Sequence, residues 1–230
     1  MTMQFTNYES TSHAKVSLRH TAFQREAPYG FYRHTFKPWL DSLLIVLAAP
    51  LILPVLVAIM LLAMLDGGNP FYTQLRVGRG GRTFRMWKIR TMVPDADARL
   101  KAHLAANPAA RAEWDATQKL KDDPRITPIG RILRKTSMDE LPQLFNVLAG
   151  TMSLVGPRPM MVQQELLYPG HTYFDLDPGI TGLWQISDRN KCDFVDRVRY
   201  DDTYGQTVSL MTDLRILFKT VAVVLRGTGC

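Results

Sequence analysis

The stretch Thr136-Ser137-Met138-Asp139-Glu140-Leu141-Pro142-Gln143 determines how the centre of the chain must fold. Proline lacks a backbone N–H and its ring clashes with the carbonyl group four residues earlier, so Pro142 fits only the first turn of a helix. The sequence therefore predicts a helix that begins between Ser137 and Glu140. Asp139 and Glu140 would then lie at a helix N-terminus, where unpaired N–H groups and the macrodipole favour negative charge. We expect both carboxylates to stay ionised, as a nucleophile or a metal ligand requires.

The same acids have a purely structural alternative. Asp139 or Ser137 could simply be an N-cap, and Ser137 and Glu140 have the S-x-x-E spacing of a capping box, in which each side chain bonds the other residue's backbone N–H. The surrounding charges favour a functional site, because cations flank the acids on both sides: Arg131, Arg134, Lys135 and Arg158. Fixed cations beside two carboxylates indicate a site for a polyanion such as a phosphorylated substrate.

Two longer segments carry a family resemblance. The run LRKTSMDELPQLFNVL at residues 133–148, followed by MSLVGPRP at residues 152–159, closely resembles the bacterial sugar transferases, also called monotopic phosphoglycosyltransferases. The likeness extends over most of the chain from about Lys37 onward. It implies a membrane-associated enzyme that transfers a phosphosugar.

The resemblance also implies a two-step reaction. Asp139 would attack the β-phosphorus of a UDP-sugar, expel UMP and carry the phosphosugar as a covalent intermediate. A polyprenyl phosphate in the membrane, such as undecaprenyl phosphate, would then accept the phosphosugar. Glu140 would bind a metal or orient the site, Arg158 would hold phosphate, and Mg²⁺ held by Asp139 and Glu140 is the expected cofactor. By analogy with members that initiate exopolysaccharide synthesis, galactose or glucose is the expected sugar.

The length, charge and cysteine content of the chain indicate its size class and the kind of partner it binds. Its 230 residues suffice for one domain with attachments, and a formal charge of +7 predicts anionic partners. Among these we expect a phosphorylated substrate and anionic lipid, and no nucleic acid. The two cysteines, Cys192 and Cys230, predict no disulfide framework, which makes a reducing compartment the default.

An apolar segment follows a basic arm. Residues 1–36 are polar and unpatterned, and we expect them to form a mobile arm. From Ser42 to Leu65 no charged residue occurs, and about 20 apolar residues suffice to cross a bilayer core. Pro50 and Pro54 interrupt this segment and predict a sharp bend.

The charges at the two ends of this segment bear on its topology. Basic residues lie before and after it: Arg33, Lys37, Arg76, Arg79, Arg82 and Arg85. The positive-inside rule therefore penalises placing either end outside. We expect residues 37–66 to form a re-entrant helix, which the resemblance also implies through a proline at the position of Pro54. A straight single crossing with a proline kink is the alternative. Residues 67–230 would form a catalytic domain on the cytoplasmic face of the bacterial inner membrane.

A β-hairpin is predicted at residues 70–92, where aromatic or apolar residues alternate with polar ones around a glycine-rich turn. We expect Lys88 and Arg90 to face substrate phosphates, since Lys supplies a point charge and Arg a bidentate fork, and the resemblance supports both. Arg134 is a third expected phosphate ligand. For Arg125, in a later loop that also resembles the family, structural and phosphate-binding roles both stay open.

The remaining segments carry weaker signals. Residues 95–121 are predicted to be helical with a break at Pro108. In the loop at residues 177–185, Gly179 and Gly182 either let the backbone approach a ligand or supply a positive φ. Asp188, Arg189 and Asn190 are candidate sugar or uridine contacts. A helix at residues 210–225 would carry an apolar stripe that fits a core or, preferably, a membrane surface: Leu214, Leu217, Phe218, Val221, Val224 and Leu225.

These patterns predict an α/β membrane-associated protein, mainly helical with a small β-hairpin, in which a re-entrant helix precedes a small catalytic domain with amphipathic surface helices. Two other functions stay open. One is a membrane-tethered basic module that binds anionic lipid or nucleic acid without catalysis, although acids inside the cation cluster argue against it. The other is a hydrolase of nucleotide sugars. The sequence leaves the oligomeric state open, and a homodimer is compatible with it.

Overall fold

The computed structural model describes residues 30–65, 67–117, 120–187 and 194–225. Most of the predicted N-terminal arm lies outside these residues, so its mobility stays a prediction. Within them the protein is mainly helical, with two small two-stranded sheets. This confirms the mainly helical class and adds a second sheet that was not predicted.

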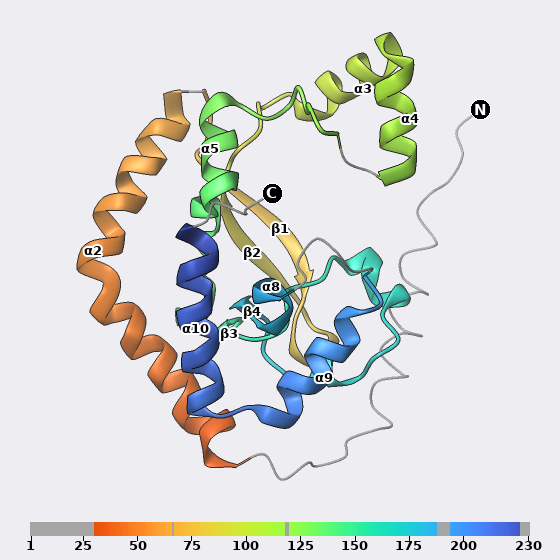
Figure 1. Ribbon diagram of the computed structural model, residues 1–230. Coiled ribbons are helices and arrows are strands. Elements are labelled where there is room, and N and C mark those ends of the chain that lie inside the picture. Colours follow the sequence, from red (N-terminus) through yellow and green to blue (C-terminus); the bar gives the residue numbers. More distant parts are fainter. Residues whose placement is uncertain (1–29, 66, 118–119, 188–193, 226–230) are drawn as a thin grey trace.

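A long bent helix runs along one side of the molecule. The short π-helix η1 (Tyr32–Phe36) leads into α2 (Lys37–Leu65), which continues through Pro50 and Pro54. Figure 1 shows α2 as an orange arc, with α10 on its concave side. Proline removes a backbone hydrogen bond and crowds the preceding turn, which accounts for a bend in the middle of the helix.

Both halves of α2 pack on the same body. Before the prolines, Ile45 packs with Met86 and the side chains around it. After the prolines, Leu56, Ile59 and Ala63 pack with Ile89. Length and composition alone make Tyr32–Leu65 the one candidate to cross a membrane among the described residues, and most of its apolar side chains are exposed. Whether it crosses or re-enters stays a prediction.

The predicted hairpin is confirmed. Strand β1 (Phe71–Val77) pairs antiparallel with β2 (Thr83–Ile89). The connection contains the short helix η2 (Arg79–Gly81), where Gly80 and Gly81 have φ of 67° and 74°. Glycine adopts this left-handed conformation without steric cost, so the glycines close the turn.

The predicted break at Pro108 is also confirmed. Helices α3 (Ala96–Ala106) and α4 (Pro108–Thr117) meet at Asn107, whose side chain accepts hydrogen bonds from the first free N–H groups of α4. In Figure 1 these two helices extend to one side of the rest of the molecule. The next helix, α5 (Pro128–Thr136), is capped by the Thr127 hydroxyl and returns the chain to α2 and the hairpin.

A second sheet joins the Gly-Pro-Arg-Pro loop to the glycine-rich loop. Strand β3 (Ser153–Val155) pairs in parallel with β4 (Gly179–Thr181). A Cβ added at Gly179 or Gly182 would lie 2.1 Å from a backbone atom of Gly156, and neither glycine has a positive φ. The glycines therefore let two backbone segments approach each other. The explanation by a positive φ is wrong, and backbone approach to a ligand stays a prediction.

The remaining helices pack on the hairpin, on the second sheet and on one another. They are η4 (Val162–Leu167), α7 (Thr172–Asp175), α8 (Leu183–Ile186), α9 (Arg197–Thr207) and α10 (Leu210–Leu225). Helix α10 buries Ile216 and leaves Phe218, Val221 and Val224 exposed. This exposed apolar strip contains half of the predicted stripe, and its contact with a membrane stays a prediction.

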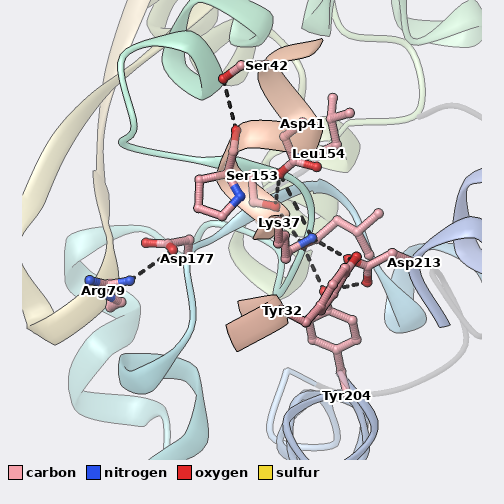
Figure 2. A network of polar contacts seen from close by, with 12 residues as sticks. Tyr32, Lys37, Asp41, Ser42, Arg79, Ser153, Leu154, Asp177, Tyr204 and Asp213 are labelled. Carbon is pink, nitrogen blue, oxygen red and sulfur yellow. Dashed lines mark hydrogen bonds and ion pairs between the residues drawn. The ribbon is translucent and has the colours of Figure 1, made fainter. Parts of the chain in front are cut away.

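A buried polar network fixes the start of α2 to the start of α10 (Figure 2). The Lys37 ammonium lies 2.5 Å from Asp213 Oδ2 and 3.9 Å from Asp41 Oδ2. Asp41 also accepts a hydrogen bond from the Ser153 hydroxyl, and Asp213 accepts one from Tyr204. Buried charges are tolerated only when paired, so this network specifies how the apolar helix docks.

Another buried carboxyl group, that of Asp201, makes stability depend on pH. Burial raises the pKa of Asp201 to about 7, although a hydrogen bond from Tyr168 and the charge of Arg197 lower it. An unfolded aspartate titrates near 3.8, so the folded state binds a proton between these values. The free energy of unfolding should therefore fall as the pH rises from about 4 to about 7.

Asp201→Asn should flatten this dependence, because the amide stays neutral. Each pH unit contributes about 1.4 kcal/mol. Between about pH 4 and about pH 7 the free energy of unfolding of the variant should therefore fall by on the order of 4 kcal/mol less than that of wild type. Denaturant unfolding in detergent at several pH values measures it. Asp115→Asn, which changes an exposed aspartate, should keep the wild-type slope. An unchanged slope in Asp201→Asn would contradict the assignment.

Candidate active site

The two adjacent acids lie on a single tight turn. Helix α5 ends at Ser137, which has a left-handed φ of 57°, and η3 (Met138–Glu140) follows directly. The turn begins where the sequence predicts, but regular α-helix begins only after Pro142, in α6 (Gln143–Leu148). The Ser137 side chain caps no backbone group of η3, so the capping-box alternative is wrong.

An asparagine in α6 holds this turn against the hairpin. Asn146 Oδ1 accepts a hydrogen bond from the Trp87 N–H at 3.0 Å, and its Nδ2 donates to the Arg85 carbonyl at 2.8 Å. Both groups belong to β2. Lys88 follows Trp87 on the same strand, so this contact sets the position of Lys88 relative to the acids.

Lys88, Asp139, Glu140 and Arg158 form one cluster, which we call the dyad cluster. Lys88 Nζ lies 3.4 Å from Asp139 Oδ2 and 3.0 Å from Glu140 Oε1. Arg158 Nη2 lies 3.5 Å from Glu140 Oε1. The structure thus brings together residues from β2, from η3 and from the Gly-Pro-Arg-Pro loop, all four of which were predicted site residues.

Asp139 is the more deeply buried acid of the pair. Burial raises the pKa of its carboxyl group above the ordinary value, while the Lys88 ammonium pulls this pKa back down and the Glu140 charge raises it further. A helix N-terminus was expected to keep this carboxylate ionised, whereas the pKa of Asp139 is raised. The reason is that η3 is only one turn long, so desolvation outweighs its dipole. Lys88 is therefore the main group that favours the charged form of Asp139.

Arg134 lies beside the dyad cluster without joining it. Its Nε donates a hydrogen bond to the Thr91 hydroxyl at 2.9 Å. Burial lowers the pKa of Arg134, and the charge of Asp139 counteracts this shift. Arg134 therefore contributes positive potential at Asp139, and phosphate contact stays a prediction.

The structure places two predicted phosphate ligands elsewhere. Arg90 donates hydrogen bonds to the carbonyls of Ala63 and Gly67 at the end of α2, the first at 3.1 Å. Arg125 pairs with Asp123 at 2.6 Å and lies over the Trp114 ring. In these positions both arginines hold chain segments together, and neither is brought to the dyad cluster. Asp188, Arg189 and Asn190 lie outside the described residues.

One arginine near the site was not singled out from the sequence. Arg76 on β1 donates to the Pro159 carbonyl at 3.2 Å and so supports the loop that carries Arg158. Burial and the nearby Arg158 charge lower the pKa of Arg76 to about 10. Nothing in the sequence distinguishes Arg76 from Arg79, its exposed neighbour, because only the packing of the hairpin separates them.

The donor set of the cluster suits a hard cation. Among the described residues, no group of three or more His, Cys, Asp or Glu side chains has the spacing of a metal site. Asp139 and Glu140 supply two carboxylates, which is the number that Mg²⁺ commonly takes from a protein when substrate phosphates complete its shell. The arrangement of two acids among cations can therefore hold phosphate groups beside a carboxylate nucleophile.

A comparison with known proteins assigns the family. The sequence model described as bacterial sugar transferase matches residues 32–227. The chain belongs to the bacterial sugar transferase family. This membership confirms the resemblance, and with it the prediction that the chain is an enzyme of the sugar-transferring class.

The chain is similar to several named members of this family. A UDP-galactose-lipid carrier transferase of Erwinia amylovora is 50% identical over 181 residues, which is 78% of this chain and 38% of the relative. An undecaprenyl-phosphate galactose phosphotransferase of Salmonella typhimurium is 46% identical, over 86% of this chain and 41% of the relative. The exopolysaccharide production protein ExoY of Sinorhizobium fredii is 45% identical over 82% of this chain and 85% of its own length. The chain thus spans about two fifths of the first two relatives and most of the third.

Proposed function

We propose that this sugar transferase moves a sugar-1-phosphate from a UDP-sugar to undecaprenyl phosphate, through a phosphosugar on Asp139, as the first step of exopolysaccharide or glycoconjugate synthesis. The observation that carries the proposal is the dyad cluster, in which the buried Asp139 carboxylate is paired with Lys88 and the adjacent Glu140 is paired with Arg158. The names of the relatives support the two substrates.

In the first step the Asp139 carboxylate attacks the β-phosphorus of the UDP-sugar. A bond forms between the carboxylate oxygen and this phosphorus, and the bond from phosphorus to the bridging oxygen breaks, which releases UMP. Lys88 and Arg158 hold phosphate oxygens and neutralise charge as the leaving phosphate departs. Lys88 also keeps the attacking group in its charged form.

In the second step the phosphate of the polyprenyl acceptor attacks the phosphorus held on Asp139. The new phosphate–phosphate bond forms as the bond to the carboxylate breaks, so the free acid is regenerated. The product is a polyprenyl-diphosphate sugar. Splitting the transfer into two displacements at one phosphorus is what a carboxylate nucleophile permits.

We propose Mg²⁺ as the cofactor of this site. Asp139 and Glu140 are the oxygen donors that would hold it, together with the substrate diphosphate. When bound, the ion would supply additional positive charge to the diphosphate oxygens. The chain's own residues position the acceptor and donor phosphates around the nucleophile.

The apolar helix gives this chemistry its location. Each buried CH₂ of a lipid is worth about 0.8 kcal/mol, so a long polyprenyl chain does not leave the bilayer readily and the nucleophile must lie at the headgroup plane. Both halves of α2 pack on the catalytic body. This favours a helix that enters one leaflet and returns, and we place the body on the cytoplasmic face of the bacterial inner membrane.

Assays with purified protein in lipid nanodiscs test the reaction and the sugar. With Mg²⁺, undecaprenyl phosphate and a panel of UDP-sugars, we expect UMP and a lipid-linked product from UDP-galactose or UDP-glucose. Release of free sugar phosphate that does not depend on the acceptor would instead identify a hydrolase. No turnover with any UDP-sugar, with lipid binding retained, would identify a non-catalytic module.

The Lys88→Met variant should change the pH dependence of the first step. Loss of the ammonium removes the main group that lowers the pKa of Asp139, so the acid limb of kcat/KM for UMP release should move to higher pH. At neutral pH we expect a loss of about 10²-fold or more. Arg85→Met changes an exposed cation on the same strand and serves as the matched control. An acid limb that stays in place in Lys88→Met would contradict this role.

A further inference from the structure

A cavity of about 410 Å³ lies under the bend of α2, between this helix, α10 and the dyad cluster. The buried side chains of α2 stop at Ile45 and resume at Leu56. Between them, Leu51, Ile52 and Val55 line the cavity. The proline bend thus separates the helix from the body at this point and leaves space beneath it.

The far wall of this cavity is also apolar. Helix α10 contributes Val223 and Val224, and Ile180 and Ile186 line it from β4 and α8. Leu51 is 77% exposed, so the lining continues into the exposed apolar surface of α2. An apolar space that is continuous with such a surface suits the hydrocarbon part of a lipid.

The other end of the cavity is charged. Glu140 and Arg158 of the dyad cluster line it. A ligand that fills the whole space therefore needs an apolar body and an anionic end that can meet Arg158. A polyprenyl phosphate has this composition, whereas a UDP-sugar has no apolar chain.

One polar side chain in the cavity has unused hydrogen-bonding groups. Gln185 on α8 is 7% exposed, and it lines the cavity. Its Oε1 and Nε2 are buried, and within the described part of the chain neither has a hydrogen-bond partner. A buried polar group without a partner is costly, and a bound ligand would satisfy it.

We infer that this cavity takes the phosphate-proximal isoprene units of the acceptor lipid and that Gln185 positions the acceptor phosphate. The inference rests on the proposed function. The isoprene units lie between α2 and α10, and their phosphate meets Arg158. Gln185 Nε2 donates to a phosphate oxygen, and Oε1 is left to accept from a sugar hydroxyl on the phosphosugar. Gln185 is thus a positioning residue for the second displacement.

Photocrosslinking tests where the acceptor binds without requiring turnover. The probe is a polyprenyl phosphate with a diazirine on its second isoprene unit, added to the full chain in nanodiscs without UDP-sugar. We expect peptides that contain residues 51–55 and 223–224 to be labelled. Excess undecaprenyl phosphate should compete, while undecaprenol and phosphatidylglycerol should not. Labelling confined to exposed α2 positions such as Leu47, or equal competition by phosphatidylglycerol, would overturn the inference.

Kinetics of the two half-reactions give the second test. Ile52→Phe narrows the cavity and should raise the KM for undecaprenyl phosphate at least tenfold, with the loss falling on lipid transfer and not on UMP exchange. Leu47→Phe adds the same bulk on an exposed part of α2 and should behave as wild type. If the wild-type protein does not exchange UMP, the proposed function itself is rejected. If UMP exchange is intact and Ile52→Phe leaves the KM for undecaprenyl phosphate unchanged, only the cavity assignment is rejected.

Gln185 variants separate phosphate positioning from packing. Gln185→Leu should raise the acceptor KM about tenfold. Gln185→Glu preserves the shape but places a negative charge beside the phosphate, so it should be worse than Gln185→Leu. If Gln185→Glu transfers as well as wild type, the side chain does not meet the acceptor phosphate.

Discussion

Asp139→Asn should abolish UMP release, with a loss of about 10⁴-fold or more, and should leave no phosphosugar on the protein. The amide has nearly the same shape as the carboxylate, but it cannot form the acyl phosphate bond. A single-turnover experiment with a UDP-sugar labelled at the β-phosphate, without acceptor, measures both quantities. In wild type, the label should remain on the denatured protein and map to the peptide that contains Asp139.

Glu140→Gln is the matched control for this experiment, because it removes the neighbouring charge of the same cluster. We expect it to slow turnover while the protein still acquires label on Asp139. Undiminished turnover in Asp139→Asn, or a phosphosugar that maps to another residue, would reject the covalent mechanism. Label on Glu140 in place of Asp139 would exchange the roles of the two acids.

Lys37→Met should destabilise the protein by about 3–5 kcal/mol, because it leaves Asp41 and Asp213 buried without their shared cation. Asp213→Asn should cost less, since its amide oxygen still accepts a hydrogen bond from one of the two tyrosines that bond Asp213, Tyr32 and Tyr204, and Lys37 stays beside Asp41. The docking of α2 depends on this network (Figure 2), so the variant should also weaken the attachment of its first turns.

The double variant Lys37→Met/Asp213→Asn completes the cycle. It leaves one buried carboxylate uncompensated where Lys37→Met leaves two, so its loss should be smaller than the sum of the single losses. Denaturant unfolding in detergent measures all three variants, with Lys101→Met on exposed α3 as the control. Additive losses would show that the ammonium and the Asp213 carboxylate do not stabilise each other.

Local patterns predicted much of the fold correctly. The alternation around Gly80 and Gly81 predicted the hairpin, since strand period and turn residues are local properties. Pro108 predicted a helix break for the same reason. The parallel pairing of β3 with β4 was not predicted, because each strand is three residues long and their contact depends on glycines far apart in the sequence.

The candidate site was predicted in part. Lys88, Asp139, Glu140 and Arg158 come together as expected. Arg90 resembles Lys88 in the sequence, and only Ile89 separates them. Strand β2 ends at Ile89, and just beyond it Arg90 bonds the Ala63 carbonyl near the end of α2, which no linear pattern reveals. The burial of Gln185 likewise depends on α8 packing against α9 and α10.

The sequence by itself determined the family, the acid pair, the apolar segment and its prolines, because each of these depends on residue types at short spacing. Only the tertiary structure decided which cations reach the acids and that burial raises the pKa of Asp139. It also showed that the bend in α2 encloses a cavity beside the dyad cluster. Distances between side chains and their exposure to water arise when distant segments pack together, so they have no signature in any one stretch of the chain.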